Sequence, residues 1–154
     1  MKPTEPLALH HSWPLFERAQ HFELGSLLGF EPQGLSVLSP SSSDAHALSC
    51  FGIGIWECDL ADDRLTWSPE VYDIFGLPHG ANVRREETVA LYAEESRAVM
   101  ERLRAYAIKH RRGFTLDAKL RLAQGAPRWM RLVASPTCDI NNRVIGLRGI
   151  KHLI

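Results

Sequence analysis

The sequence lacks an excess of charge of either sign, because 18 Lys and Arg are matched by 18 Asp and Glu in 154 residues. A chain without net charge has no general attraction for nucleic acid or for an anionic membrane. No apolar run approaches the roughly 18 residues that a membrane-spanning helix needs, and the start MKPTEPLALHHSWP has no sustained apolar core of a signal peptide. We expect a cytoplasmic protein with no nucleic-acid partner and no membrane insertion.

Cysteine is also scarce. The three cysteines, Cys50, Cys58 and Cys138, do not form the close pairs of a zinc or redox motif, which is consistent with a reducing compartment. His10 and His11 have no carboxylate or thiol at a spacing that would complete a ligand set. No Ser-His-acid set is suggested by spacing either. We therefore predict no metal site, no catalytic residues and no enzymatic activity.

What the chain does contain divides unevenly, and its length suits one domain with a proper core. Residues 1–46 read as an N-terminal extension. Within it we expect a helix in WPLFERAQHFELGSLLGF, with Pro14 in the first turn, and a Ser/Pro linker, SPSSSD. Asp44 is placed to cap a short helix, AHALSC. Residues 47–154 carry the stronger signals and form the predicted domain.

The first half of the domain predicts a hairpin followed by a short helix. FGIGIWECDL suits a buried strand, the aspartates after it supply turn chemistry, and RLTW is a second strand. Ser68 and Pro69 are suited to the N-cap and the first helical position. Gly76 can end the helix in a left-handed conformation. Trp67 stands where the hairpin passes into the helix and can hold that helix against the sheet.

The second half predicts a long helix and three strands. EESRAVMERLRAYAIKH places Val99, Leu103 and Tyr106 on one face at helical spacing. FTLDAKLRL alternates apolar and polar residues with period two, and RWMRLVASPT and RVIGLRGIKHLI are further strands. This order of elements predicts an α+β fold, in which a five-stranded antiparallel sheet has its helices packed on one face.

Taken together, the segments GIWECDLADDRLTWSPEVYDIFGL and FTLDAKLRLAQGAPRWMRLVASPTCDINNRVIGLRGIKHLI resemble a PAS domain of the bacterial sensory type. The resemblance covers about residues 47–154. It rests on a Gly-aromatic strand, Leu-x-Trp-Ser-Pro, a Phe-Gly helix end and a hairpin that leads to Arg-Trp. Two features depart from the family pattern. Ala93-Glu94-Glu95-Ser96 stands in place of a His-Pro-x-Asp turn, and GIKHLI lacks the closing Asp-Ile-Thr-like signature.

The resemblance implies a non-enzymatic sensory and interaction module that signals through changed protein contacts, with a signalling protein or effector domain as partner. It also implies a small-ligand pocket between the sheet and the long helix, for which the candidate lining residues are Ile53, Ile55, Tyr72, Phe75, Leu103, Tyr106 and Leu116. Two alternatives remain open. In the first alternative, side chains fill the pocket and the domain only dimerises. In the second, the chain is the sensor portion of a histidine kinase or diguanylate cyclase. The missing closing signature favours a stand-alone module.

No cofactor is predicted, although an unknown small molecule or a non-covalent flavin remains open. Haem-binding PAS domains use a histidine on the long helix, and this helix has only His110, at its end. A covalent flavin needs a cysteine in the helical region, and no cysteine lies between Trp67 and Gly113.

The chain is expected to form a homodimer. Trp129, Arg131 and Val133 share one face of their strand. That face is either core or an outer surface covered by another chain or by the N-terminal segment. The candidate interface residues are Trp13, Phe16, Leu24, Leu27, Trp129, Arg131 and Val133.

Overall fold

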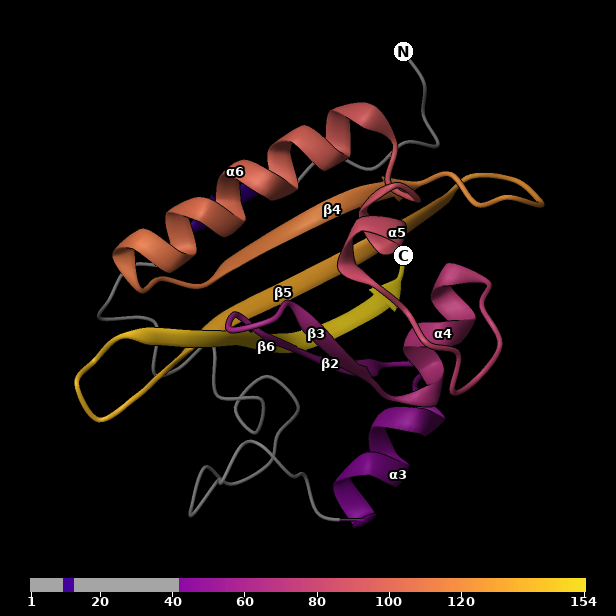
Figure 1. Cartoon of the computed structure of the whole chain (residues 1–154). Coiled ribbons are helices and arrows are strands. Elements are labelled where there is room, and N and C mark those ends of the chain that lie inside the picture. The colour runs from indigo at the N-terminus through magenta and orange to yellow at the C-terminus, as the bar shows by residue number, and fades with distance from the viewer. Residues whose placement is uncertain (1–9, 13–41) are drawn as a thin grey trace.

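A curved antiparallel sheet forms the centre of the molecule (Figure 1). The computed structural model describes residues 10–12 and 42–154. Its five main strands run β4-β5-β6-β2-β3 across the sheet, and every neighbouring pair is antiparallel. Their bounds are β2 Gly54–Asp59, β3 Arg64–Trp67, β4 Phe114–Leu120, β5 Arg128–Cys138 and β6 Val144–Leu153. The predicted five-stranded sheet is confirmed.

A sixth, short strand extends the sheet beyond β4. The strand β1 (His10–Ser12) pairs antiparallel with β4, so that His10 lies opposite Leu116 and Ser12 opposite Phe114. The sequence pattern did not predict this strand, because three residues are too few to show an alternation. The predicted helix in residues 13–30 lies outside the described residues. Within those residues, no helix is long and apolar enough to cross a membrane.

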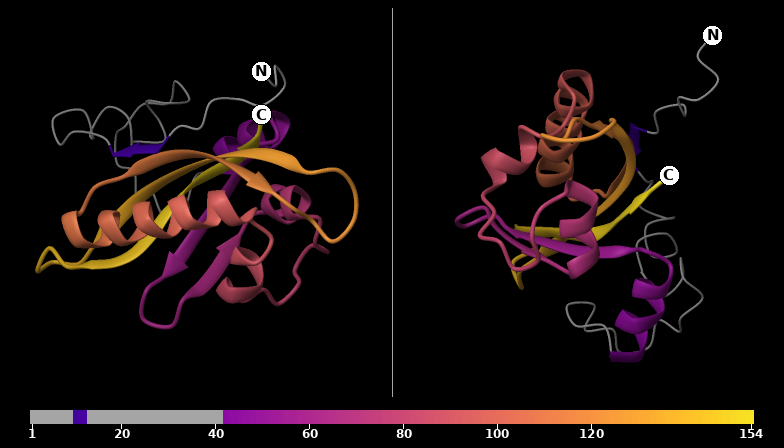
Figure 2. Two further views of the ribbon diagram at one scale, coloured as in Figure 1. Left: turned by 90° about the horizontal axis from the view of Figure 1, so that it is seen from above. Right: turned by 90° about the vertical axis from the view of Figure 1, so that its right-hand side faces the viewer.

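Three helices cover one face of the sheet, as predicted. They are α4 (Pro69–Phe75), α5 (Arg85–Val89) and α6 (Glu94–His110), and Figure 2 shows them gathered on the concave side. A further helix, α3 (Ser42–Cys50), lies beside α4 at the end of the sheet (Figures 1 and 2). The hydroxyl of Ser49 in α3 donates a 3.3 Å hydrogen bond to Glu70 in α4.

The long helix α6 has the predicted bounds but a different buried face. Met100 and Ala107 are its buried residues, whereas Leu103 is only partly buried and Tyr106 is 42% exposed. The Tyr106 ring lies 4.3 Å from the ring of His110, centroid to centroid, on the outer side of the helix. The predicted face was wrong for Tyr106 because the helix is rotated toward Met100, which has the longer flexible side chain to fill the core.

The junction between β3 and α4 is held by aromatic packing. Trp67 is buried, its ring stacks on Phe75 at 5.0 Å, and the edge of Tyr72 approaches it at 5.1 Å. Gly76 ends α4 in the left-handed conformation, with φ 68°. Trp67 therefore holds α4 against the sheet, as the sequence indicated.

The predicted cap at Ser68 is wrong in its chemistry. Ser68 occupies the N-cap position, but its hydroxyl makes no capping hydrogen bond to the helix. Instead, Ser68 Oγ accepts a 2.9 Å hydrogen bond from the backbone N–H of Ile55 in β2, and the Ser68 N–H donates to the Ile55 carbonyl. The hydroxyl thus continues the β2–β3 pairing past the end of β3.

Candidate functional site

A cavity of about 50 Å³ lies between the inner face of the sheet and the helices α5 and α6. Such a volume exceeds the space that a single water needs. Residues from all five main strands and both helices contribute to its wall. The lining residues are Trp56, Cys58, Leu65, Arg85, Thr88, Val89, Tyr92, Met100, Arg104, Phe114, Leu132, Leu147 and Lys151.

The lining is mainly apolar, with the neutral polar side chains of Cys58, Thr88 and Tyr92 and a cationic group of three residues, Arg85, Arg104 and Lys151. No Asp or Glu is among the residues that line this cavity. The arginines come from α5 and α6, and the lysine comes from β6. Basic side chains beside a mainly apolar cavity favour an anion there, because opposite charges attract each other more strongly where little water screens them.

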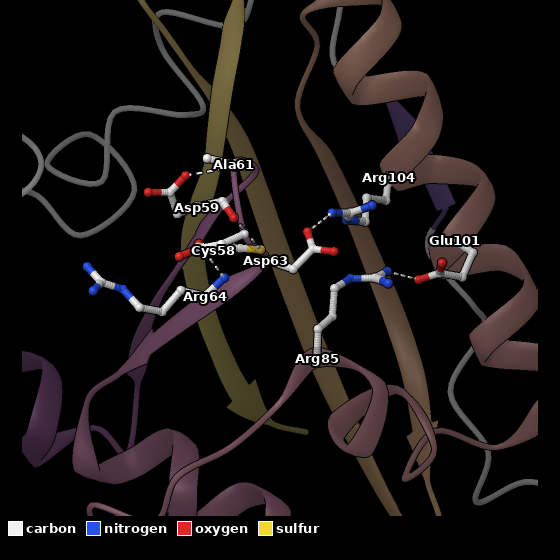
Figure 3. Close-up of polar contacts among 9 residues, drawn as sticks. Cys58, Asp59, Ala61, Asp63, Arg64, Arg85, Glu101 and Arg104 are labelled. Atoms are coloured by element: carbon white, nitrogen blue, oxygen red, sulfur yellow. Dashed lines mark hydrogen bonds and ion pairs between the residues drawn. The ribbon is translucent and has the colours of Figure 1, made fainter.

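Each arginine is held from outside the cavity by an ion pair (Figure 3). Arg85 pairs with Glu101 in α6. Arg104 Nη2 lies 3.0 Å from Asp63 Oδ1, in the turn between β2 and β3. The carboxylates are about half exposed and the arginine side chains are mostly buried. These two pairs therefore join α5 and the β2–β3 turn to the long helix at the cavity.

Lys151 is 6% exposed and lies among aromatic rings. Its Nζ is 4.9 Å from the centroid of Phe75, 5.1 Å from that of Trp56 and 5.6 Å from that of Trp67. Burial, opposed in part by Cys58 and assisted by the charge of Arg85, lowers the pKa of the Lys151 amine to about 7. The amine is therefore far less basic than that of an exposed lysine.

Two other titratable groups in the wall are kept neutral by the same environment. Burial raises the pKa of the Cys58 thiol, and the neighbouring Arg104 lowers it in part. Burial also raises the pKa of the Tyr92 hydroxyl, with Arg85 acting in the opposite direction. At neutral pH the cavity thus offers a thiol and a phenol as neutral hydrogen-bonding groups.

None of the seven residues predicted to line a ligand pocket is among the lining residues of this cavity. Ile53 and Ile55 are only partly buried, and Ile55 lies opposite Ile150 on the face away from the helices. Phe75 and Leu116 are buried in the core around the cavity, with Tyr72 and Leu103 packed against that core. The structure therefore brings four of the seven predicted residues together in or against the core, and Ile53, Ile55 and Tyr106 lie outside it. Their role in ligand binding stays a prediction.

The interface candidates on β5 lie on the outer face of the sheet. Met130, Leu132 and Ala134 belong to the core under the helices, so Trp129, Arg131 and Val133 point to the opposite side. There, Arg131 makes a bidentate ion pair with Asp117 in β4, at 2.8 and 3.0 Å. The other four candidates, Trp13, Phe16, Leu24 and Leu27, lie outside the described residues.

Sequence reasoning missed the cationic group. For Lys151 the sequence did contain a signal. Leu147, Gly149 and Lys151 alternate along β6 and lie on the face of the sheet toward the helices, so a charged residue follows two non-polar ones on the core side. Arg85 and Arg104 had no comparable signal, because on a helix they look like ordinary solvated charges. Among the described residues no group of three His, Cys, Asp or Glu side chains is placed to hold a metal ion.

Comparison with known proteins establishes the family. A family model described as the PAS fold matches residues 64–151, more than half of the chain. The chain belongs to the PAS family, and the resemblance seen in the sequence is confirmed. No curated protein matches the sequence.

Solved structures of several PAS proteins share this fold. One is a sensory box histidine kinase/response regulator from Burkholderia thailandensis E264, with a TM-score of 0.62 and 15% identity over 73% of this chain and 85% of that chain. Another is the N-terminal domain of a diguanylate cyclase with PAS/PAC sensor from Marinobacter aquaeolei, with a TM-score of 0.60 and 16% identity over 66% of this chain and 94% of that chain. At these identities the likeness shows the fold alone.

A third similar structure is an RNA-binding light-oxygen-voltage receptor, with a TM-score of 0.58 and 17% identity. The match covers 66% of this chain and 29% of that receptor. A further similar structure, of a light-oxygen-voltage domain, is described with a flavin analogue. The only thiol among the lining residues, Cys58, lies on the strand β2, and a cavity of about 50 Å³ has no room for three fused rings. The residues of this cavity do not fit a flavin.

Proposed function

We propose that this PAS domain is a non-enzymatic sensor that binds a small organic anion in the cavity and signals through changed protein contacts. The observation that supports the proposal is the cationic group of Arg85, Arg104 and Lys151 in an apolar wall without a carboxylate. An anion with a short apolar body would meet both features. The volume of about 50 Å³ limits it to a few non-hydrogen atoms.

The outer ion pairs supply a route from occupancy to contacts. Arg104 lines the cavity and also forms an ion pair with Asp63 in the β2–β3 turn. An anion in the cavity would compete with Asp63 for the same planar group. A ligand shifts a conformational equilibrium only through different affinities for the two states. Here the difference would be the strength of the Arg104–Asp63 pair, and hence the position of the turn against α6.

The signal is received by a protein partner. We propose a homodimer that uses the outer sheet face around Trp129 and Val133, together with the N-terminal segment. The likeness to the kinase and cyclase domains supports an effector of those classes, either in the same protein or as a separate chain. A domain that only dimerises would show the same outer face without any affinity for anions.

Isothermal titration calorimetry of the full chain with acetate, lactate, pyruvate and succinate tests the ligand. We expect at least one of these anions to bind, and Arg104→Gln to weaken that binding about tenfold or more, because a charge-assisted hydrogen bond is worth about 1.5–3 kcal/mol. Arg64→Gln is the matched control, since Arg64 is exposed and points away from Arg85 and Arg104 (Figure 3). Absence of binding by all four anions, or equal weakening in both variants, would refute the proposal.

A further inference from the structure

Lys151 has an environment that an ordinary structural lysine does not have. It is buried, it lines the cavity, and none of the described carboxylates pairs with it. A lysine held only for stability would pair with an acid or extend its amine to water. Here the amine lines a cavity that is also lined by Arg85 and Arg104.

Two effects on the Lys151 amine oppose each other. The three rings favour the ammonium form, and a cation–π contact is worth about 0.5–2 kcal/mol, which corresponds to about one pKa unit. Loss of hydration favours the neutral amine and shifts a fully buried lysine by up to 3–5 units. Desolvation is the larger effect, in agreement with a pKa of about 7. About half of the molecules then carry a neutral amine at pH 7, roughly a thousandfold more than for an exposed lysine.

We propose that Lys151 is a covalent ligand site, where its amine condenses reversibly with the carbonyl group of a small α-oxo acid. The Lys151 nitrogen lone pair forms the C–N bond, and the carbonyl oxygen leaves as water after proton transfer from nitrogen. The product is an imine, and no oxidant or reductant takes part. This inference rests on the proposed anion site, since Arg85 and Arg104 hold the carboxylate of the bound acid.

The chemistry of the wall selects this class of ligand over others. A simple carboxylate would satisfy the arginines but would leave the neutral amine without a reaction. A simple ketone or aldehyde would react with the amine but would offer no anionic group to the two arginines. An α-oxo acid carries both groups on adjacent carbon atoms, and its short apolar end suits Met100, Leu132 and Leu147.

Reductive trapping in the full chain tests the proposal. The protein is incubated at pH 7 with pyruvate and sodium cyanoborohydride, and the adduct is located by intact-mass measurement and peptide mapping. We expect one adduct per chain, on Lys151, with Lys109 and Lys119 at least about tenfold less modified. Lys109 is exposed and serves as an internal control for general amine reactivity. Equal modification of Lys109 and Lys151 would overturn the proposal.

Two further compounds separate this proposal from the anion site. Lactate has the carboxylate but no carbonyl, and acetone has the carbonyl but no carboxylate. We expect calorimetric binding of both pyruvate and lactate, and trapping of acetone on Lys151 at least about tenfold slower than that of pyruvate. Binding of both acids without any adduct on Lys151 would refute the imine and leave the anion site standing. Failure of both acids to bind, with no adduct, would refute the imine, and it would refute the anion site as well when acetate and succinate also fail to bind. Acetone trapped as fast as pyruvate would refute the α-oxo acid.

The variant Lys151→Met supplies the complementary test, because methionine has similar length and no nucleophile. We expect the adduct to disappear in this variant while lactate still binds. An adduct of undiminished yield would show that another amine reacts. The peptide map of the wild-type protein gives the same answer should the variant not fold.

Discussion

At the scale of single residues, Ser68 shows how one hydroxyl serves the sheet rather than the helix that it precedes. Its Oγ accepts the hydrogen bond of the Ile55 N–H at 2.9 Å, in partly buried surroundings. Ser68→Ala would leave that N–H without its acceptor. We expect a loss of about 1–2 kcal/mol in the free energy of unfolding, measured by urea denaturation.

Ser68→Thr is the matched control, since it keeps a hydroxyl at the same position and should retain most of the stability. An unchanged urea midpoint in Ser68→Ala would show that the N–H finds another partner at no cost.

Lys151 makes stability depend on pH in a direction that can be stated in advance. In the unfolded chain a lysine keeps its proton up to about pH 10.4, whereas the folded protein releases the Lys151 proton near pH 7. Between these values the unfolded state binds more protons, so stability rises with pH. We expect the unfolding free energy of the wild type, relative to Lys151→Met, to increase from pH 7 to pH 10 by up to about 4 kcal/mol.

Urea denaturation of both proteins across that range measures the difference, and titrations common to both cancel. Lys109→Met provides the control, because Lys109 is exposed and its comparison with wild type should stay flat. A difference between wild type and Lys151→Met that does not change with pH would contradict the lowered basicity of Lys151.

At the scale of elements, α4 lies so close to β2 that only glycine fits beneath it. A Cβ on Gly54 would stand 2.4 Å from Val71 Cγ2 and 2.9 Å from the Val71 backbone nitrogen. The second atom belongs to the helix backbone and cannot rotate away. Gly54→Ala should therefore displace α4 and destabilise the protein by about 2 kcal/mol or more, as overpacked cores do.

The same substitution in a Val71→Ala background provides the test of mechanism. Removing Cγ2 relieves the shorter contact, so urea denaturation should show a smaller cost of Gly54→Ala there than in the wild type. Equal costs in the two backgrounds would mean that contact with Val71 is not the reason for glycine at this position.

The elements themselves were largely predictable, because each carries a local signal. The alternation from Phe114 onward predicted β4, and the bounds Glu94–His110 of the long helix are those expected. The rotation of that helix was not predictable from its own sequence. Val99, Met100 and Leu103 offer two overlapping apolar faces, and the choice between them depends on what the sheet presents opposite.

At the scale of the whole molecule, the cavity could not be predicted, because its chemistry depends on elements far apart in the chain. Arg85, Arg104 and Lys151 meet only once the sheet has closed and both helices have packed. The sequence predicted aromatic and aliphatic residues as the wall of a ligand pocket between the sheet and the long helix, and none of them lines this cavity. Four of them pack in or against the core, namely Tyr72, Phe75, Leu103 and Leu116, and charged residues form part of the cavity wall.

The N-terminal segment provides the last prediction, and it concerns the outer face of the sheet. The strand β1 pairs with β4 along an edge that would otherwise be open. Trp129 and Val133 lie on the face away from the helices, as half-buried and buried side chains respectively. Deleting residues 1–40 removes β1 and the apolar residues that follow it in the sequence. We expect lower solubility or a changed oligomeric state, measured by light scattering, together with a lower melting temperature.

Deleting residues 1–9 alone is the matched control, because it keeps β1 and everything after it. This shorter deletion should leave the mass in solution and the melting temperature unchanged. An open sheet edge is a template for pairing with another chain, so the two deletions should diverge most at high protein concentration. Equal solubility, mass and melting temperature for the two truncated proteins would mean that β1 and the segment after it contribute nothing to the sheet, and would contradict their proposed role in a homodimer.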